Sequence, residues 1–188
     1  MSNYKTLEEI AQIYTGLRTT RYINKNTKHQ QIILKKINTN NTIEIEKQKL
    51  PEIDKKYYSK KDDILIHATG TTNTINIIKQ EGIIIPAHYI ILRVKQDDPQ
   101  FIYHILKSEE FKKIERKLSG GTNLPFLKTP DLKKMKIKIP PPEKQKTYVK
   151  IMELINKKTQ LEERKIKINK NIQNWIFKKE LGENYVKL

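Results

Sequence analysis

Short apolar runs separated by turn-forming residues fill much of the first hundred positions. Two of these runs flank the Asn-rich stretch "NTNN", a pattern typical of two strands joined by a turn. The run Ile64–Ile66 is uninterrupted, which indicates a buried strand. The pattern predicts strands at 31–37, 42–47, 64–66 and 75–78, and a further apolar strand after the break at Pro86.

Two stretches have the apolar spacing of helices. Near the start, residues 7–14 follow the capping box Thr6–Glu9, and Gly16 is expected to end this short helix. Later, Asp98 is expected to cap a longer helix that has Pro99 at its first position. The apolar face expected for this second helix consists of Phe101, Ile102, Ile105, Leu106, Phe111, Ile114 and Leu118.

A basic strand, three prolines and a long helix follow. Residues 134–139 alternate Lys with apolar side chains, which predicts a half-buried strand. Pro140–Pro142 stop this strand, and no Pro or Gly interrupts the sequence again until Gly182. We therefore expect one helix over 143–179, about 55 Å long at ~1.5 Å per residue. The resulting organisation is a globular domain at 1–142 and a helix region at 143–188.

The long helix has an apolar stripe whose members recur in alternating steps of three and four. Lysines interrupt the stripe at 158, 165 and 179, so the heptad pattern is imperfect. One small domain cannot cover a stripe of this length, and we expect a partner helix. The alternatives are a helix that folds back on its own domain, or a hairpin that breaks near 156–164. The apolar stripe residues are Ile151, Leu154, Leu161, Ile168, Ile172 and Trp175.

Composition adds a strong positive charge to this picture. The formal net charge is +17 and the sequence pI is near 9.8, which favours a polyanionic partner, above all nucleic acid. Part of the excess reflects the Ile, Asn and Lys bias expected of AT-rich DNA. The sequence has no Cys and no apolar run of membrane-spanning length. We therefore expect a soluble protein of the cytoplasm.

Motifs of cofactor or metal chemistry are weak. The six glycines form neither a phosphate-binding loop nor a dinucleotide fingerprint, so we expect no cofactor. The four histidines lack metal-ligand spacing, so we expect no metal site, and His67 and His88 are interpreted as structural. A small metal-dependent nuclease using Glu44, Glu46 and Asp63 remains a remote alternative. The sequence favours binding over catalysis.

Three loop-like stretches carry side chains suited to contacting phosphates and base edges. Two of only five arginines fall within four residues in the first of them, at Arg18 and Arg21. The other two stretches centre on glycines that permit close backbone approach. Each is equally compatible with an ordinary solvated turn. The candidate DNA-binding residues are Arg18, Thr19, Arg21, Lys25, Thr69, Thr71, Thr72, Asn73, Gly120, Gly121, Thr122, Asn123 and Lys128.

The order of these features resembles one half of the specificity subunit of type I restriction-modification systems. The segments that carry the resemblance are "LEEIAQIYTGL", "KDDILIHATGTT", "YHILKS", "SGGTN" and "LKTPDLKKMKIKIPPPEKQ", followed by the long helix. A strand ending in Ile-Pro-x-Pro-x-x-x-Gln is common in that family and matches Ile139 to Gln145, with Pro141 as an additional proline. The resemblance extends over essentially the whole chain.

The resemblance implies an α/β (α+β) fold, in which a mixed-sheet target-recognition domain precedes a long coiled-coil-like helix. It further implies a non-catalytic subunit that reads one half of a bipartite site in double-stranded DNA. Methyltransferase subunits, and in some assemblies the restriction subunit, are then the expected partners. Members usually contain two recognition domains, whereas this sequence has one, so we expect a homodimer through the helix. The alternative is a regulatory or truncated coiled-coil partner that reads no DNA itself.

Overall fold

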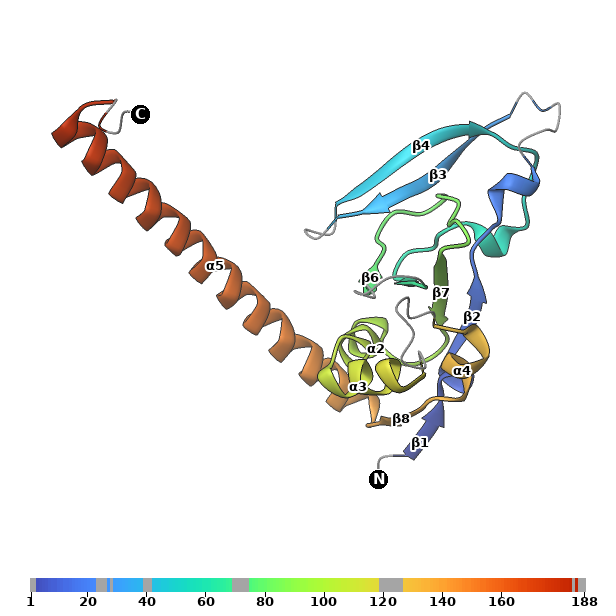
Figure 1. Cartoon of the computed structure of the whole chain (residues 1–188). Coiled ribbons are helices and arrows are strands. Elements are labelled where there is room, and N and C mark those ends of the chain that lie inside the picture. The colour runs from blue at the N-terminus through green and yellow to red at the C-terminus, as the bar shows by residue number, and fades with distance from the viewer. Residues whose placement is uncertain are drawn as a thin grey trace. The chain divides into compact units, whose positions relative to one another are not determined.

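A computed structural model describes residues 3–22, 27, 29–38, 42–68, 75–118, 127–183 and 185. Its chain divides into two compact units, Met1–Lys146 and Thr147–Leu188. The first is an α/β globule and the second belongs to the long helix (Figure 1).

A four-stranded sheet forms the centre of the globule. Its strands are β2 (Ala11–Thr15), β7 (Tyr89–Val94), β5 (Ile64–His67) and β6 (Ile75–Ile77), in the spatial order β2-β7-β5-β6. All three ladders are antiparallel. Parallel pairing occurs, within the described part of the chain, at two isolated bridges, Leu17↔Pro86 and Ile33↔Ile84. The expected strands at 64–66, at 75–78 and after Pro86 are confirmed.

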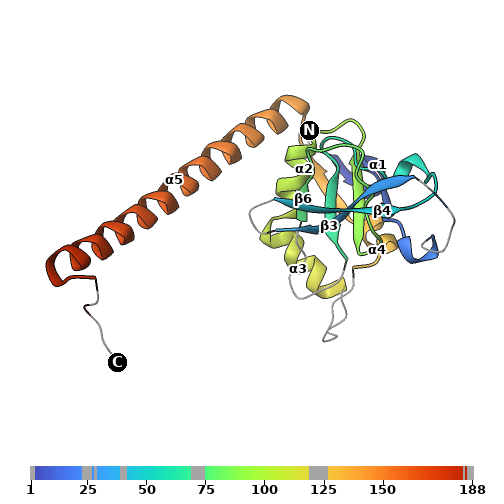
Figure 2. The same ribbon diagram turned by 90° about the horizontal axis from the view of Figure 1, so that it is seen from above.

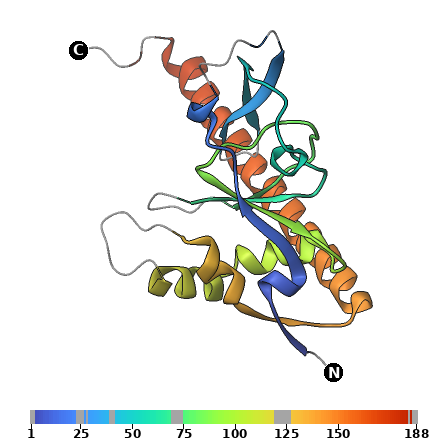
Figure 3. The ribbon, with the colours of Figure 1, turned by 90° about the vertical axis from the view of Figure 1, so that its right-hand side faces the viewer.

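Both faces of this sheet are covered, which explains the uninterrupted apolar run of β5. Strands β3 (Gln30–Ile37) and β4 (Ile43–Lys49) pair antiparallel, as expected, and Leu34 of β3 packs with Leu65 and Ile91 of the sheet. On the opposite side, α2 (Pro99–Leu106) contacts β6 and α4 (Thr129–Lys134) contacts β2. Figures 2 and 3 show this layering of hairpin, sheet and helices. The central residues of β5 and β7 are therefore apolar on both faces of the sheet.

A second, two-stranded ladder joins the two ends of the globule. Strand β1 (Asn3–Thr6) pairs antiparallel with β8 (Lys136–Ile139), and the register places Tyr4 opposite Lys138. Ile137 and Ile139 are buried while Lys136 and Lys138 are exposed, so the expected alternation is confirmed from Lys136 onward. The expected strand at 134–139 is wrong at its start, because Lys134 ends α4. The ladder brings the first described strand beside the last strand before the prolines.

The helix expected after residue 6 is wrong beyond its first turn. Helix α1 (Leu7–Ile10) is capped as predicted, since the Thr6 backbone N–H donates to Glu9 Oε2, but β2 begins directly at Ala11. The apolar residues at 11 and 13 fit a strand as well as a helix, and Ile13 is buried opposite Leu92 of β7. Pairing with a central strand therefore decides the conformation of this segment.

The single helix expected over 99–118 is two helices. Helix α2 starts at the predicted Asp98 cap, whose Oδ1 accepts from the Gln100 and Phe101 N–H groups. It ends at Leu106, and α3 (Glu109–Leu118) follows, with Ser108 Oγ accepting from the Phe111 N–H. A serine hydroxyl that caps a new helix competes with continuation of the old one. A further short helix, α4, is formed by Thr129–Lys134.

The long C-terminal helix is confirmed. Helix α5 runs from Pro142 to Leu181, and Gly182 follows it with φ of 85°, in the left-handed region where helices commonly end. Its first turn, up to Lys146, belongs to the globular unit. No helix of the described residues is long and apolar enough to cross a membrane.

Candidate nucleic-acid interface

One end of the four-stranded sheet gathers segments that are far apart in the sequence. The register places Thr15 opposite Ile90, and His67 opposite Tyr89, so β2 and β5 end where β7 begins. The first candidate loop leaves the sheet after Thr15, and the second leaves after His67. The Leu127 N–H donates to the Ala68 carbonyl oxygen at 3.1 Å, which brings the end of the third candidate loop to the same place.

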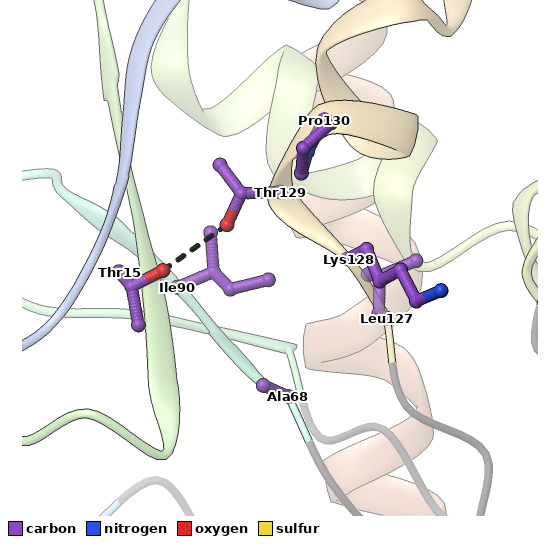
Figure 4. Close-up of a pocket in the computed structure, with 7 residues that line it drawn as sticks. All are labelled: Thr15, Ala68, Ile90, Leu127, Lys128, Thr129 and Pro130. Carbon is purple, nitrogen blue, oxygen red and sulfur yellow. Dashed lines mark hydrogen bonds between the residues drawn. The ribbon is translucent and has the colours of Figure 1, made fainter.

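The first hollow at this end lies between β2 and the start of α4. It encloses about 300 Å³ and its apolar lining includes Ala68, Ile90 and Leu127. Thr15 Oγ1 and Thr129 Oγ1 face each other across it at 3.2 Å, a hydrogen bond drawn in Figure 4. The exposed Lys128 also lines this hollow. In Figure 4 the Lys128 side chain points away from the two hydroxyl groups, each of which can accept or donate a hydrogen bond.

A second hollow of about 510 Å³ shares Thr15 with the first. Its lining includes both predicted arginines, Arg18 and Arg21, and the aromatic rings of Tyr22 and Tyr57. Because Thr15 borders both hollows, the loop with the two arginines and the segment with Lys128 belong to one continuous region. We call this region, with its two hollows, the loop-end surface.

A short helical turn groups the two arginines of the loop-end surface. Residues Thr19–Arg21 form a 3-10 turn, in which the Arg21 N–H donates to the Arg18 carbonyl oxygen at 3.2 Å. Thr19, the remaining predicted residue of this turn, is half-buried. Arg18 is the residue before this turn and Arg21 is its last residue, and both line the second hollow.

Arg18 and Arg21 differ from Arg93 in their electrostatic surroundings. Both are exposed, and neither forms an ion pair with another residue of the described chain. Arg93, in contrast, donates to both carboxylate oxygens of the buried Asp63, at 2.9 and 2.7 Å, and this hydrogen bonding raises the pKa of Arg93. An arginine without a protein partner retains all its donors for a phosphate or a guanine.

A glycine allows the chain to leave β2 toward the loop-end surface. A Cβ atom on Gly16 would overlap the carbonyl oxygens of Ile85 and Pro86. The backbone approaches this closely because the N–H groups of Gly16 and Leu17 donate to the carbonyls of Tyr89 and Ile85, at 2.9 and 2.7 Å. Gly16 therefore fixes the start of the arginine loop, whereas the sequence pattern predicts only that it ends a helix.

Two histidines also lie at this end of the sheet. The rings of His67 and His88 are 5.3 Å apart, and both contact the ring of Tyr89, at 5.1 and 4.6 Å. Burial lowers the pKa of His88, and the neighbouring His67 lowers it further. The sequence pattern indicates only two separate structural histidines. Their positions beside the ends of two apolar strands were the one sign that their rings could lie together. The cluster borders the loop-end surface as a group of three aromatic rings.

The remaining sequence predictions for DNA contacts fall on residues outside the described part of the chain. Asn76, another polar residue beside the second loop, is described and lies buried in β6. The predicted residues outside the description are Lys25, Thr69, Thr71, Thr72, Asn73, Gly120, Gly121, Thr122 and Asn123.

The carboxylates proposed for a metal nuclease occupy different environments. Glu44 and Glu46 are exposed on β4, and Glu44 accepts a hydrogen bond from the Asn38 side chain at 3.1 Å. Asp63 is 1% exposed, and both of its oxygens are bound by Arg93. A carboxylate whose oxygens are held by an arginine is poorly suited to bind a metal ion. This arrangement gives the nuclease alternative no support.

The predicted stripe on α5 is exposed along its length. Leu154 and Trp175, toward its two ends, are 60% and 59% exposed, and Ile155 and Ile176, which the prediction omitted, are exposed beside them. Apolar surface of this extent is typical of an interaction site. The other exposed stripe residues are Ile151, Leu161, Ile168 and Ile172.

Comparison with known proteins agrees with this architecture. The family described as type I restriction modification DNA specificity domain matches residues 1–170. The specificity subunit of the type I restriction enzyme MjaVIII from Methanocaldococcus jannaschii is 38% identical over 91 residues, which cover 46% of this chain and 21% of that subunit.

Solved structures of type I systems share the fold. The HsdS subunit from Thermoanaerobacter tengcongensis has a TM-score of 0.71 at 17% identity, over 100% of this chain and 51% of that one. A chain from a structure concerning complex assembly and conformational transition of the type I R-M system has a TM-score of 0.72 at 16% identity, with the same coverage of 100% and 51%. The S subunit from M. genitalium has a TM-score of 0.60 at 15% identity, over 98% and 47%.

The present chain thus spans about half the length of these solved chains. The family match covers the sheet, the loop-end surface and most of the long helix. The chain belongs to the family of type I restriction-modification DNA specificity domains.

Proposed function

We propose that this chain reads one half of a bipartite DNA site for a type I restriction-modification assembly, and that the loop-end surface is the part that meets DNA. The observation that carries the proposal is the pair of exposed arginines, Arg18 and Arg21, which have no ion-pair partner in the described chain and border a hollow lined by tyrosines. The net charge of +17 supports attraction of the duplex as a whole.

The chemistry of the loop-end surface suits direct reading of base edges. An arginine can donate two hydrogen bonds to O6 and N7 of guanine in the major groove. The hydroxyls of Thr15 and Thr129 can accept or donate, and Lys128 can neutralise a phosphate beside them. Other exposed lysines contribute affinity without sequence preference. The chain itself performs no bond chemistry in this proposal, and associated methyltransferase subunits act on the DNA it selects.

The exposed stripe of α5 supports pairing with a second copy of the chain. A helix of 40 residues extends about 60 Å at ~1.5 Å per residue. Two such helices packed antiparallel would hold two recognition globules more than one DNA turn, about 34 Å, apart. Identical globules related by a two-fold axis require an inverted-repeat target with a spacer.

DNA reading is tested with Arg18→Ala and Arg21→Ala in the chain co-expressed with its methyltransferase subunit. Both variants should weaken binding to the preferred site more than binding to random DNA, and should relax one position of the methylated motif. Loss of one bidentate contact corresponds to about 1–3 kcal/mol of discrimination. Arg116→Ala is a matched control, because Arg116 is also exposed and lies on α3. An unchanged motif in both loop variants would refute the assignment and would favour a partner-binding role.

Helix pairing is tested separately by sedimentation of the purified chain. Leu154→Glu should convert a dimer to a monomer, because it places a charge in the apolar stripe. Asn156→Glu adds the same charge at an exposed position two residues away, on another side of the helix, and should leave the dimer intact. A wild-type chain that stays monomeric at tens of micromolar would exclude self-pairing.

A further inference from the structure

Gln145 is an unusual residue in the first turn of α5, because its side chain is only 2% exposed. Its amide is engaged in three directions. Nε2 donates to Asp97 Oδ1 and to the Pro140 carbonyl oxygen, each at 2.9 Å, and Oε1 accepts from the Asp98 N–H at 2.9 Å. Both donors and the acceptor of the buried amide are therefore satisfied.

The partners of Gln145 are themselves fixed within the globule. Asp97 uses its other oxygen, Oδ2, to pair with Lys5 of β1 at 3.3 Å. Asp98 caps α2 through Oδ1 while its N–H is bound by Gln145. The turn at 97–98 thus connects β1, the start of α2 and the first turn of α5.

An exposed ion pair and the prolines also lie at this junction. The nearby ion pair of Lys146 with Glu143, at 3.7 Å, is highly exposed and contributes little. The prolines restrict the backbone at 140–142, and the carbonyl oxygens of Pro140 and Pro141 accept hydrogen bonds from the first turn of α5. A buried amide with three partners tolerates little displacement, because any lost bond leaves a buried polar group unsatisfied.

We propose that Gln145 is a positioning residue that fixes the first turn of α5 on the 97–98 turn and thereby restricts the spacer length accepted between two DNA half-sites. This inference rests on the proposed function, since a spacer has meaning only for a bipartite target. Gln145 would therefore contribute to DNA specificity through the spacer length, without contacting a base. The half-site sequence would be read at the loop-end surface, and the separation would be restricted at this clamp.

The test uses Gln145→Met, which preserves the length of the side chain and removes all three hydrogen bonds. Lys144→Met is the matched control, because Lys144 is exposed on the same turn and its side chain makes no hydrogen bond within the described residues. Both are assembled with the methyltransferase subunit and given DNA whose half-sites are separated by the preferred spacer or by one base pair more or less.

Gln145→Met should raise methylation at the altered spacers relative to the preferred one by about tenfold, the change expected for loss of a hydrogen bond to a charged group. The methylated half-site sequence should stay the same, and Lys144→Met should behave as wild type. Asp97→Asn, which removes the charge but retains an acceptor, should have a smaller effect.

Hydrogen exchange of the purified chain provides a readout that does not depend on methylation. In Gln145→Met the Asp98 amide should exchange faster, while the amides of β5 and β7 stay protected. If that local release is seen and the spacer preference remains that of wild type, the inference is wrong. Global loss of protection would instead assign Gln145 a merely structural role, which also contradicts it. A wild-type complex that methylates no bipartite site would refute the proposed function, a result distinct from either of these.

Discussion

The ion pair between Arg93 and Asp63 offers a quantitative test of how the globule supports the loop-end surface. Arg93 donates two hydrogen bonds to the carboxylate of Asp63 and one, at 3.0 Å, to the Tyr58 carbonyl oxygen. The perturbation is Arg93→Met, which retains most of the apolar stem and removes all three donors. Asp63 would keep one described donor, the Lys60 N–H at 2.8 Å.

The expected cost is about 3–5 kcal/mol, because Asp63 is 1% exposed and would become a buried charge without its partner. A count of bonds agrees with this range, since three lost hydrogen bonds at about 1–1.5 kcal/mol each give about 3–4.5 kcal/mol. Adding Asp63→Leu to Arg93→Met should recover much of the loss, because the isolated charge then disappears. Removal of both charges is therefore expected to be milder than removal of the arginine alone.

Urea unfolding followed by near-UV circular dichroism of the tyrosines is the suitable assay, because the single tryptophan, Trp175, belongs to the other unit. With an m-value of about 2 kcal/mol/M, Arg93→Met should lower the midpoint by about 2 M. A loss below about 1 kcal/mol, or a double variant no more stable than the single one, would refute the reasoning. Tyr57, the neighbour of Tyr58, lines the second hollow of the loop-end surface. Weaker DNA binding should therefore accompany the lower stability of Arg93→Met.

Three further outcomes are expected from single substitutions. Gly16→Ala should cost about 3 kcal/mol, because the new Cβ overlaps the Pro86 carbonyl, and a midpoint within error of wild type would contradict the close approach. Asn76→Val should leave the free energy of unfolding unchanged or raise it by about 1 kcal/mol, since the buried Nδ2 has no hydrogen-bond partner in the described chain. A clearly lower urea midpoint would show that the Asn76 side chain stabilises the fold and would contradict this reasoning. The lowered pKa of His88, caused by burial and then by His67, favours the neutral form in the folded state. Stability should therefore be complete above the usual pKa of 6.5 and decrease as pH falls through the lowered value, and His88→Gln should flatten this decrease in unfolding series between about pH 7 and pH 5. An equally steep decrease in the variant would exclude His88 as its origin.

Several parts of the fold follow from local sequence signals. Helix α5 was predictable because two prolines precede it, a third is its first residue and a glycine follows it, with neither residue type in its interior. The strand at 64–67 was predictable because its apolar run is too short for a helix and is bounded by polar residues. The clustering of Arg18 and Arg21 was visible as a concentration of a scarce residue in one short segment.

Other features depended on contacts between distant residues. Ala11–Thr15 fits either a helix or a strand by its apolar spacing, and pairing with β7 decided for the strand. The meeting of Thr15 with Thr129, and of Ala68 with Leu127, joins segments that no local pattern relates. The same holds for Gln145, which belongs to a common family pattern but has two of its three partners, Asp98 and Asp97, 47 and 48 residues away.

The sequence by itself therefore determined the periodic elements, the charge and the residue types suited to DNA. Backbone propensity, capping and hydrophobic period act over a few neighbouring residues, so they can be recognised without a fold. Tertiary structure alone decided which polar groups share an exposed surface and which form hydrogen bonds or ion pairs inside the globule. Arg93 and Arg18 are the same residue type, yet one is bound to a buried carboxylate and the other is left exposed, because burial and hydrogen-bond partners are set by the packing of the whole globule.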